Sequence, residues 1–150
     1  MIRLSRLTDY AIVVVAELSR TSSTLQTAGN LADRTHIPEP TVAKVLKILT
    51  RGSVVESARG VNGGYMITRA LNDITIGEVI EAMNGPLTLT ACVDDDDSDC
   101  EIATHCLMKG RWNPVNAAIR TAFASVKLSD MIRSTMPAAC ATCTITTTKG

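Results

Sequence analysis

The apolar pattern in the first third of this 150-residue chain constrains its fold more than any other feature. A short helix over residues 28–35 is predicted, because apolar residues lie on one side and Thr27 can cap its start. A second helix over 40–51 has apolar residues at i, i+3, i+4 and i+7, and prolines suit its first turn. The turn between them falls at His36, a residue type that tolerates a left-handed backbone. This is a helix-turn-helix pattern, with the apolar template Leu31, Ala32, Ile37, Val42, Val45, Leu46 and Leu49.

A β-hairpin and further helices complete the predicted fold. The fold class is mainly α with a small β-hairpin, which makes the first part of the chain a winged helix-turn-helix. Gly52 is expected to end the helix over 40–51 as its C-terminal cap. The other predicted elements are a helix over 8–20 capped by Ser5 or Thr8, strands at 54–55 and 65–68, a glycine-rich tip at 59–64, a helix from Thr75 to Met83, and a long final helix from Cys106 to Ile132, interrupted or kinked near Asn113 and Pro114.

The distribution of charge points to a polyanionic partner for the first half. Residues 1–70 hold nine basic and five acidic residues, a net charge of +4, whereas residues 71–150 hold six and ten, a net charge of −4. DNA is therefore expected to bind the first half. The N-terminal residues of the helix over 40–51 are expected to meet base edges in the major groove, and the hairpin is expected to reach the minor groove or the backbone. The predicted DNA-binding residues are Arg3, Arg6, Pro40, Thr41, Lys44, Lys47, Arg51, Arg59, Asn62, Gly63, Gly64 and Tyr65.

The five cysteines indicate metal or redox chemistry rather than disulfide bonding. An odd number cannot pair completely, and we expect no signal peptide or membrane span, because the apolar stretch 11–18 is too short. A cytoplasmic protein is therefore predicted. The spacing Cys92-x7-Cys100-x5-Cys106 differs from the paired C-x2-C knuckles of a zinc ribbon. Wide, uneven gaps suit a loop around an iron–sulfur cluster, and three ordinary reduced thiols are the alternative.

Three segments together resemble the Rrf-two family of iron–sulfur transcription regulators. They are residues 4–10 (LSRLTDY), residues 59–65 (RGVNGGY) and the three cysteines, and the match runs from residue 2 to about 132. Residues 100–106 with Trp112 are most similar to the branch that regulates the SUF system of iron–sulfur cluster assembly. The resemblance implies a homodimer crossed by the long final helix. It also implies a 2Fe–2S or 4Fe–4S cluster on Cys92, Cys100 and Cys106, and repression of iron or iron–sulfur genes.

The resulting domain organisation has four parts. Residues 1–84 are expected to form the winged helix-turn-helix DNA-binding domain, 85–106 the cluster-binding loop, 107–134 the dimerisation helix and 135–150 a disordered tail. The acidic run at 94–97 lacks the spaced ligands of a calcium loop, and Cys140-x2-Cys143 is treated as an accessory feature of the tail.

The residue that supplies the fourth cluster ligand in one family branch is replaced in this chain. That branch places a histidine three residues after the third cysteine, where this chain has Lys109, a poor ligand. Asp9 matches a position from which the nitric-oxide-sensing branch supplies a carboxylate from the other subunit, so it is one candidate. His105 is the other; in a helix its side chain would diverge by about 100° from that of Cys106.

Two other functions compete with the cluster-gated regulator. One is a thiol-redox or zinc-holding regulator or interaction protein without a cluster, which would be colourless as purified. The other is an enzyme, which the sequence disfavours: it contains no nucleophile paired with His and a carboxylate, no phosphate-binding loop and no dinucleotide fingerprint. We therefore expect no small-molecule substrate.

Overall fold

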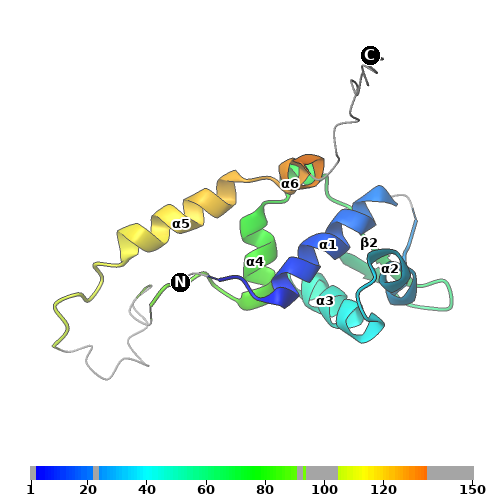
Figure 1. The fold of residues 1–150 in the computed structure, drawn as a ribbon, viewed down its shortest axis with the longest axis horizontal. Helices are drawn as coiled ribbons and strands as arrows, with labels where there is room; N and C mark the ends of the chain where they lie inside the picture. Colours follow the sequence, from blue (N-terminus) through cyan, green and yellow to red (C-terminus); the bar gives the residue numbers. More distant parts are fainter. Residues whose placement is uncertain (1–2, 22–23, 91–92, 94–104, 135–150) are drawn as a thin grey trace, which may run out of the picture.

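The computed structural model describes residues 3–21, 24–90, 93 and 105–134. The elements in chain order are helices α1 (Arg6–Arg20), α2 (Ala28–Thr35) and α3 (Glu39–Arg51), strands β1 (Glu56–Ala58) and β2 (Gly64–Met66), the 3-10 helix η1 (Leu71–Asp73), and helices α4 (Ile76–Asn84), α5 (Asn113–Ser125) and α6 (Leu128–Ser134). Figure 1 shows α1 to α4 packed together, with α5 extending away from them. None of the described helices is long and apolar enough to cross a membrane.

The helix-turn-helix forms where the sequence predicts it. Thr27 caps α2, because its hydroxyl accepts a hydrogen bond from the Asn30 N–H at 3.2 Å. His36 follows α2 in the left-handed conformation at φ 57°, as the turn requires. The apolar stripe of α3 lies in the core with residues from α1, α2 and α4; the fully buried side chains of α3 are Val42, Val45, Leu46 and Leu49. Burial of this stripe fixes which face of α3 is left in solvent.

Gly52 follows the end of α3 as predicted, but a glycine is needed there for a reason other than the conformation of a C-terminal cap. Its φ is −80°, so it needs no left-handed conformation, and Ser53 takes the positive φ of 57° instead. A Cβ at Gly52 would lie 2.4 Å from the Cβ of Ala82 on α4. The glycine therefore permits close approach of α4 to the end of α3.

The wing is a two-stranded antiparallel sheet that starts two residues later than predicted. Glu56 pairs with Met66 and Ala58 with Gly64, whereas Val54 and Val55, predicted as the first strand, are buried in the core before the sheet begins. Gln26 attaches the wing to the segment before α2: its N–H donates to the Tyr65 carbonyl, and its carbonyl accepts from the Tyr65 N–H, both at 2.9 Å. The base of the wing is thus fixed to the helix-turn-helix.

The long helix predicted from Cys106 to Ile132, with an interruption or kink near Asn113 and Pro114, is replaced by two shorter helices, α5 and α6. Residues 105–112 form successive turns, and Gly110 has a φ of 68°, so helix α5 begins only at Asn113 with Pro114 in its first turn. The helix stops again at Val126, which is extended because its carbonyl accepts from the Ile76 N–H at 3.0 Å. Leu128 then begins α6 and is fully buried in the core. The chain therefore breaks the helix to attach its C-terminal part to α4.

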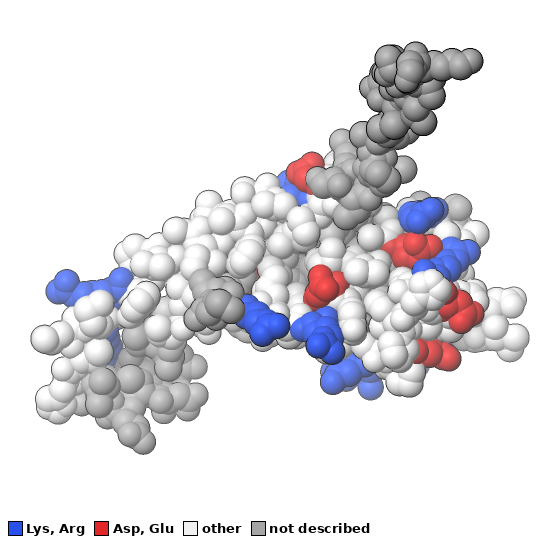
Figure 2. All heavy atoms as spheres, in the orientation of Figure 1, with Lys and Arg blue, Asp and Glu red and all other residues white. Residues whose placement is uncertain are grey.

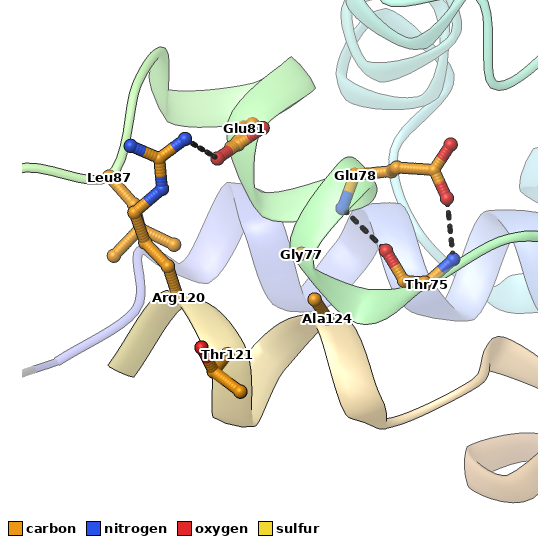
Figure 3. Close-up of a pocket in the computed structure, with 8 residues that line it drawn as sticks. All are labelled: Thr75, Gly77, Glu78, Glu81, Leu87, Arg120, Thr121 and Ala124. Atoms are coloured by element: carbon orange, nitrogen blue, oxygen red, sulfur yellow. Dashed lines mark hydrogen bonds and ion pairs between the residues drawn. The ribbon is translucent and has the colours of Figure 1, made fainter. Parts of the chain in front are cut away.

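Helix α4 connects the helix-turn-helix with α5. Thr75 and Glu78 form a capping box at its start, in which each side chain bonds the backbone N–H of the other (Figure 3). Figure 3 also shows Gly77 facing Ala124 on α5, and Glu81 of α4 pointing toward Arg120 of α5. The Glu81 carboxylate lies 3.9 Å from the Arg120 guanidinium. A Cβ at Gly77 would meet the α5 backbone at 3.5 Å, an ordinary contact distance, so the two helices pack directly against each other here.

Candidate nucleic-acid interface and cysteine site

The solvent face of α3 carries the residues predicted to read DNA. Pro40, Lys44, Lys47 and Arg51 are exposed along the helix, and Thr41 is half-buried in its first turn. Arg6, the first residue of α1, and Arg3, which precedes the helix, are exposed as well. Figure 2 shows Lys and Arg side chains grouped along the lower edge of the molecule, below α1.

The wing presents its tip to solvent and its base to the core. Arg59 and Asn62 are exposed in the tip, and Gly63 is half-buried there. A Cβ at Gly63 would lie 2.5 Å from the Ala58 carbonyl oxygen, and one at Gly64 would lie 2.8 Å from that of Gln26. Gly63 is therefore required by the tight backbone of the wing itself, and Gly64 by the close approach of the segment at Gln26. Tyr65 packs partly against the core, so its ring also serves the fold.

The basic residues predicted to bind DNA differ from the other basic residues in their ion pairing. Arg20 and Arg34 both lie within 4 Å of the Glu17 carboxylate, and Arg69 bonds Glu78 at 2.9 Å. Among the described residues, no acidic side chain pairs with the bases predicted to bind DNA, namely Arg3, Arg6, Lys44, Lys47, Arg51 and Arg59. Their charge is thus available to an external polyanion.

The capping carboxylate Glu78 has a perturbed acidity. Partial burial disfavours its charged form, but the hydrogen bond from the Thr75 N–H and the neighbouring Arg69 guanidinium outweigh that effect. The pKa of Glu78 therefore lies below its ordinary value of 4.5. The carboxylate anchors α4 beside the base of the wing.

The predicted cluster site is only partly within the described residues. Cys106 is described, as a half-buried free thiol, whereas Cys92 and Cys100, like Cys140 and Cys143, lie outside the described residues. In the part of the chain that the structure describes, no three His, Cys, Asp or Glu side chains come together as a metal site. Cys106 lies in a turn, since its carbonyl accepts from the Lys109 N–H at 3.3 Å. His105 beside it is exposed, and because the segment is not helical, the helical argument against His105 does not apply.

Asp9 and Cys106 occupy different parts of one chain. Asp9 is exposed in the first turn of α1. Figure 1 shows the segment 105–112 at the far end of α5, well away from α1. Asp9 therefore does not lie beside Cys106 of its own chain.

One buried polar residue was not predicted from the sequence. Asn116 of α5 is buried and bonds the backbone at Leu87 and Leu89, in the segment that leads to Cys92. The only signal in the sequence is an asparagine inside a helix, where its intrinsic propensity is poor.

Comparisons with known proteins agree with this arrangement. A sequence model of the Rrf2 family, described as an iron-dependent transcriptional regulator, matches residues 4–134. The transcriptional regulator NsrR of Bacillus licheniformis is 29% identical over 131 residues, which cover 87% of this chain and 92% of the relative. NsrR of Oceanobacillus iheyensis is 26% identical over 132 residues, which cover 87% and 90%.

Solved structures share the fold at lower identity. CymR (YrzC), described as the global cysteine regulator of B. subtilis, superposes with a TM-score of 0.66 at 22% identity, covering 90% of this chain and 99% of its own. IscR of T. potens superposes with a TM-score of 0.65 at 22% identity, covering 94% and 93%. This mainly helical protein with a small antiparallel sheet therefore belongs to the Rrf2 family and is a DNA-binding transcriptional regulator, not an enzyme.

Proposed function

We propose that the protein represses transcription by inserting α3 into the major groove while the wing contacts the neighbouring minor groove or backbone. The observation that carries this proposal is the set of exposed bases on α1, α3 and the wing tip, which lack acidic partners in the described part of the chain. Thr41 and Lys44 lie toward the N-terminal part of α3, the part that reads base edges in helix-turn-helix proteins. Lys47, Arg51 and Arg59 would bind phosphates.

The proposed functional unit on DNA is a homodimer. Helix α5 has thirteen residues, of which Asn116 is the buried one, and apolar side chains on and before it are exposed. Exposed apolar residues that gather in one region favour association with another chain. They are Val115 in α5, Leu107, Met108 and Trp112 before it, and Val126 directly after it. Two copies joined through α5 would present two α3 helices to a two-fold operator.

We further propose that Cys92, Cys100 and Cys106 hold an iron–sulfur cluster. Thiolates are the ligands that such clusters take, and Cys106 is a free thiol with partial access to solvent. The family description as iron-dependent supports an iron cofactor. When bound, the cluster would supply a site that iron scarcity or oxidants can disassemble. We also propose that the protein belongs to the branch that regulates the SUF system. Its targets would then be iron or iron–sulfur assembly genes, and its location would be the cytoplasm.

Asp9 of the partner subunit is the proposed fourth ligand. Asp9 is exposed in the first turn of α1, and Figure 1 shows α1 away from segment 105–112 of the same chain, so another copy would have to bring Asp9 to Cys106. His105 is the alternative, since it neighbours Cys106 in a turn. With a ligand from the partner, the cluster would link the two subunits. Loss of the cluster would then change the spacing of the two α3 helices.

A thiol-based regulator without a cluster is the second candidate. The half-exposed free thiol of Cys106 favours it, and solved relatives include CymR, described as a cysteine regulator, and an oxidized form of Staphylococcus aureus CymR. Zinc on the same cysteines belongs to this candidate. In both cases the DNA-binding part of the proposal is unchanged.

Anaerobic purification distinguishes the two candidates. The cluster proposal predicts a coloured protein with visible absorption, with two or four iron atoms and matching sulfide per chain. Cys106→Ala should lose the iron, and Asp9→Ala should weaken iron retention, whereas Lys109→Ala should leave it unchanged. A colourless protein that contains zinc or no metal would refute the cluster. Retention of iron by Asp9→Ala together with its loss from His105→Ala would assign the fourth ligand to His105.

A further inference from the structure

The buried residue of α5 is polar, which is unusual for the inward face of a helix. The Asn116 side chain is 2% exposed. Burying an amide is unfavourable unless its donor and acceptor both find partners. Here the Nδ2 group donates to the Leu87 carbonyl at 3.0 Å, and the Oδ1 atom accepts from the Leu89 N–H at 3.1 Å. One side chain thus satisfies two backbone groups that are two residues apart.

The segment held by Asn116 has no regular secondary structure of its own. Residues 87–90 follow the end of α4 and lead to Cys92, so their backbone groups need partners outside the segment. Leu87 lies beside Arg120 in Figure 3, which places this segment along α5. Val93 is buried and lines a surface hollow together with Asn113, Asn116 and Ala117 of α5. Contacts with α5 therefore lie on both sides of Cys92 in the sequence.

The end of α4, just before this segment, is held by α1. Thr8 is fully buried, and its hydroxyl donates to the Asn84 Oδ1 atom at 3.2 Å at the end of α4. The Ser5 hydroxyl, which caps α1, bonds the Thr8 hydroxyl at 2.8 Å. Asp9, the proposed cluster ligand, is the next residue. Two sets of hydrogen bonds therefore flank this stretch of chain: Thr8 of α1 holds Asn84 at the end of α4, and Asn116 of α5 holds Leu87 and Leu89.

We infer that Asn116 is a positioning residue that fixes the segment before Cys92 to α5, so that the state of the cysteines is transmitted to α5. The inference rests on the proposed cluster function of those cysteines. Because Asn116 bonds main-chain groups, it holds this segment whatever side chains residues 87–89 carry. A change in the position of Cys92 would act on α5 first, through Asn116 and the hollow that Val93 lines.

Hydrogen exchange in the cluster-free full chain tests the attachment directly. Asn116→Leu removes both bonds at similar volume, and exchange of the Leu89 amide should accelerate about tenfold. Asn116→Asp keeps the acceptor for the Leu89 N–H but loses the donor to Leu87, so a smaller acceleration is expected. Asn113→Leu, the same substitution at an exposed residue lining the same hollow, is the matched control and should exchange like the wild type.

Cluster release tests the transmission. After reconstitution, Asn116→Leu should lose visible absorption to an iron chelator several times faster than the wild type and Asn113→Leu. The positioning role would be overturned if the Leu89 amide exchanged at the same rate in Asn116→Leu as in the wild type. It would also be overturned if amides throughout α1 and α4 lost as much protection as Leu89, since the substitution would then have loosened the whole fold. A wild-type chain that takes up no iron would overturn the proposed cluster and the transmission with it. In that case the exchange data would still decide whether Asn116 holds the segment.

Discussion

Substitution of Gly52 by alanine tests how closely α4 must approach the end of α3. The φ of Gly52 is −80°, a value that alanine adopts without strain, so the backbone itself predicts no penalty. The added Cβ would lie 2.4 Å from the Ala82 Cβ and 3.2 Å from the Ala82 Cα. The first distance is far below van der Waals contact, so α4 must shift away from α3. Overpacking of this kind costs about 1–3 kcal/mol.

A double-mutant cycle isolates that contact. Ala82→Gly alone should cost about 1 kcal/mol as a glycine inside a helix. Adding it to Gly52→Ala should restore part of the lost stability, because it removes the nearest atom; the Cα at 3.2 Å limits the recovery. The free energy of unfolding is measured with denaturant at one fixed protomer concentration.

Gly60 supplies a matched control for this cycle. It has a φ of 117° and nothing within 4 Å of an added Cβ, so Gly60→Ala should destabilise through the backbone alone. Ala82→Gly should not restore that loss. The reasoning is refuted if Gly52→Ala is as stable as the wild type, or if its effect and that of Ala82→Gly are additive.

Three further predictions concern charge, acidity and the thiol. Lys47→Ala should weaken binding to a DNA duplex selected from random sequences and reduce the slope of log affinity against log salt by about 1, whereas Arg20→Ala, whose charge is paired with Glu17, should change neither in a fluorescence titration. The lowered pKa of Glu78 stabilises the fold above its ordinary value of 4.5, and this contribution is lost as the pH falls through the folded-state value. The stability difference between wild type and Glu78→Gln in urea should therefore shrink below about pH 4.5; a difference that grows there would contradict the assignment. Cys106 should react with a maleimide reagent in the cluster-free protein and be protected after reconstitution, and equal labelling of both forms would argue against its role as a ligand.

Local signals in the sequence were sufficient for the helix-turn-helix. The predicted bounds of α2 match the structure because its cap, Thr27, and its apolar side all lie within one short stretch. The left-handed turn at His36 is set in the same way. The exposed bases of α3 were predictable because burying the apolar stripe leaves only one face for them.

Features that depend on distant residues were missed or misread. Val54 and Val55 have the residue types of a strand, but they are buried in the core before the sheet begins. The actual strand β1 is exposed and has no apolar pattern that would predict it. The break at Val126 depends on pairing with Ile76, and no local residue signals it. The role of Asn116 likewise requires knowing that residues 87–89 return to α5.

Affinity for the selected duplex, measured with and without reconstituted cluster, tests the central proposal most directly. The two forms are compared anaerobically at one salt concentration and one protein concentration, with Cys106→Ala as the form that cannot assemble the site. We predict at least a fivefold difference in Kd between the two wild-type forms, the lower range of typical coupling between sites. We also predict that Cys106→Ala binds like the cluster-free wild type under both conditions. Equal Kd values for the wild type with and without its cluster would contradict cluster gating.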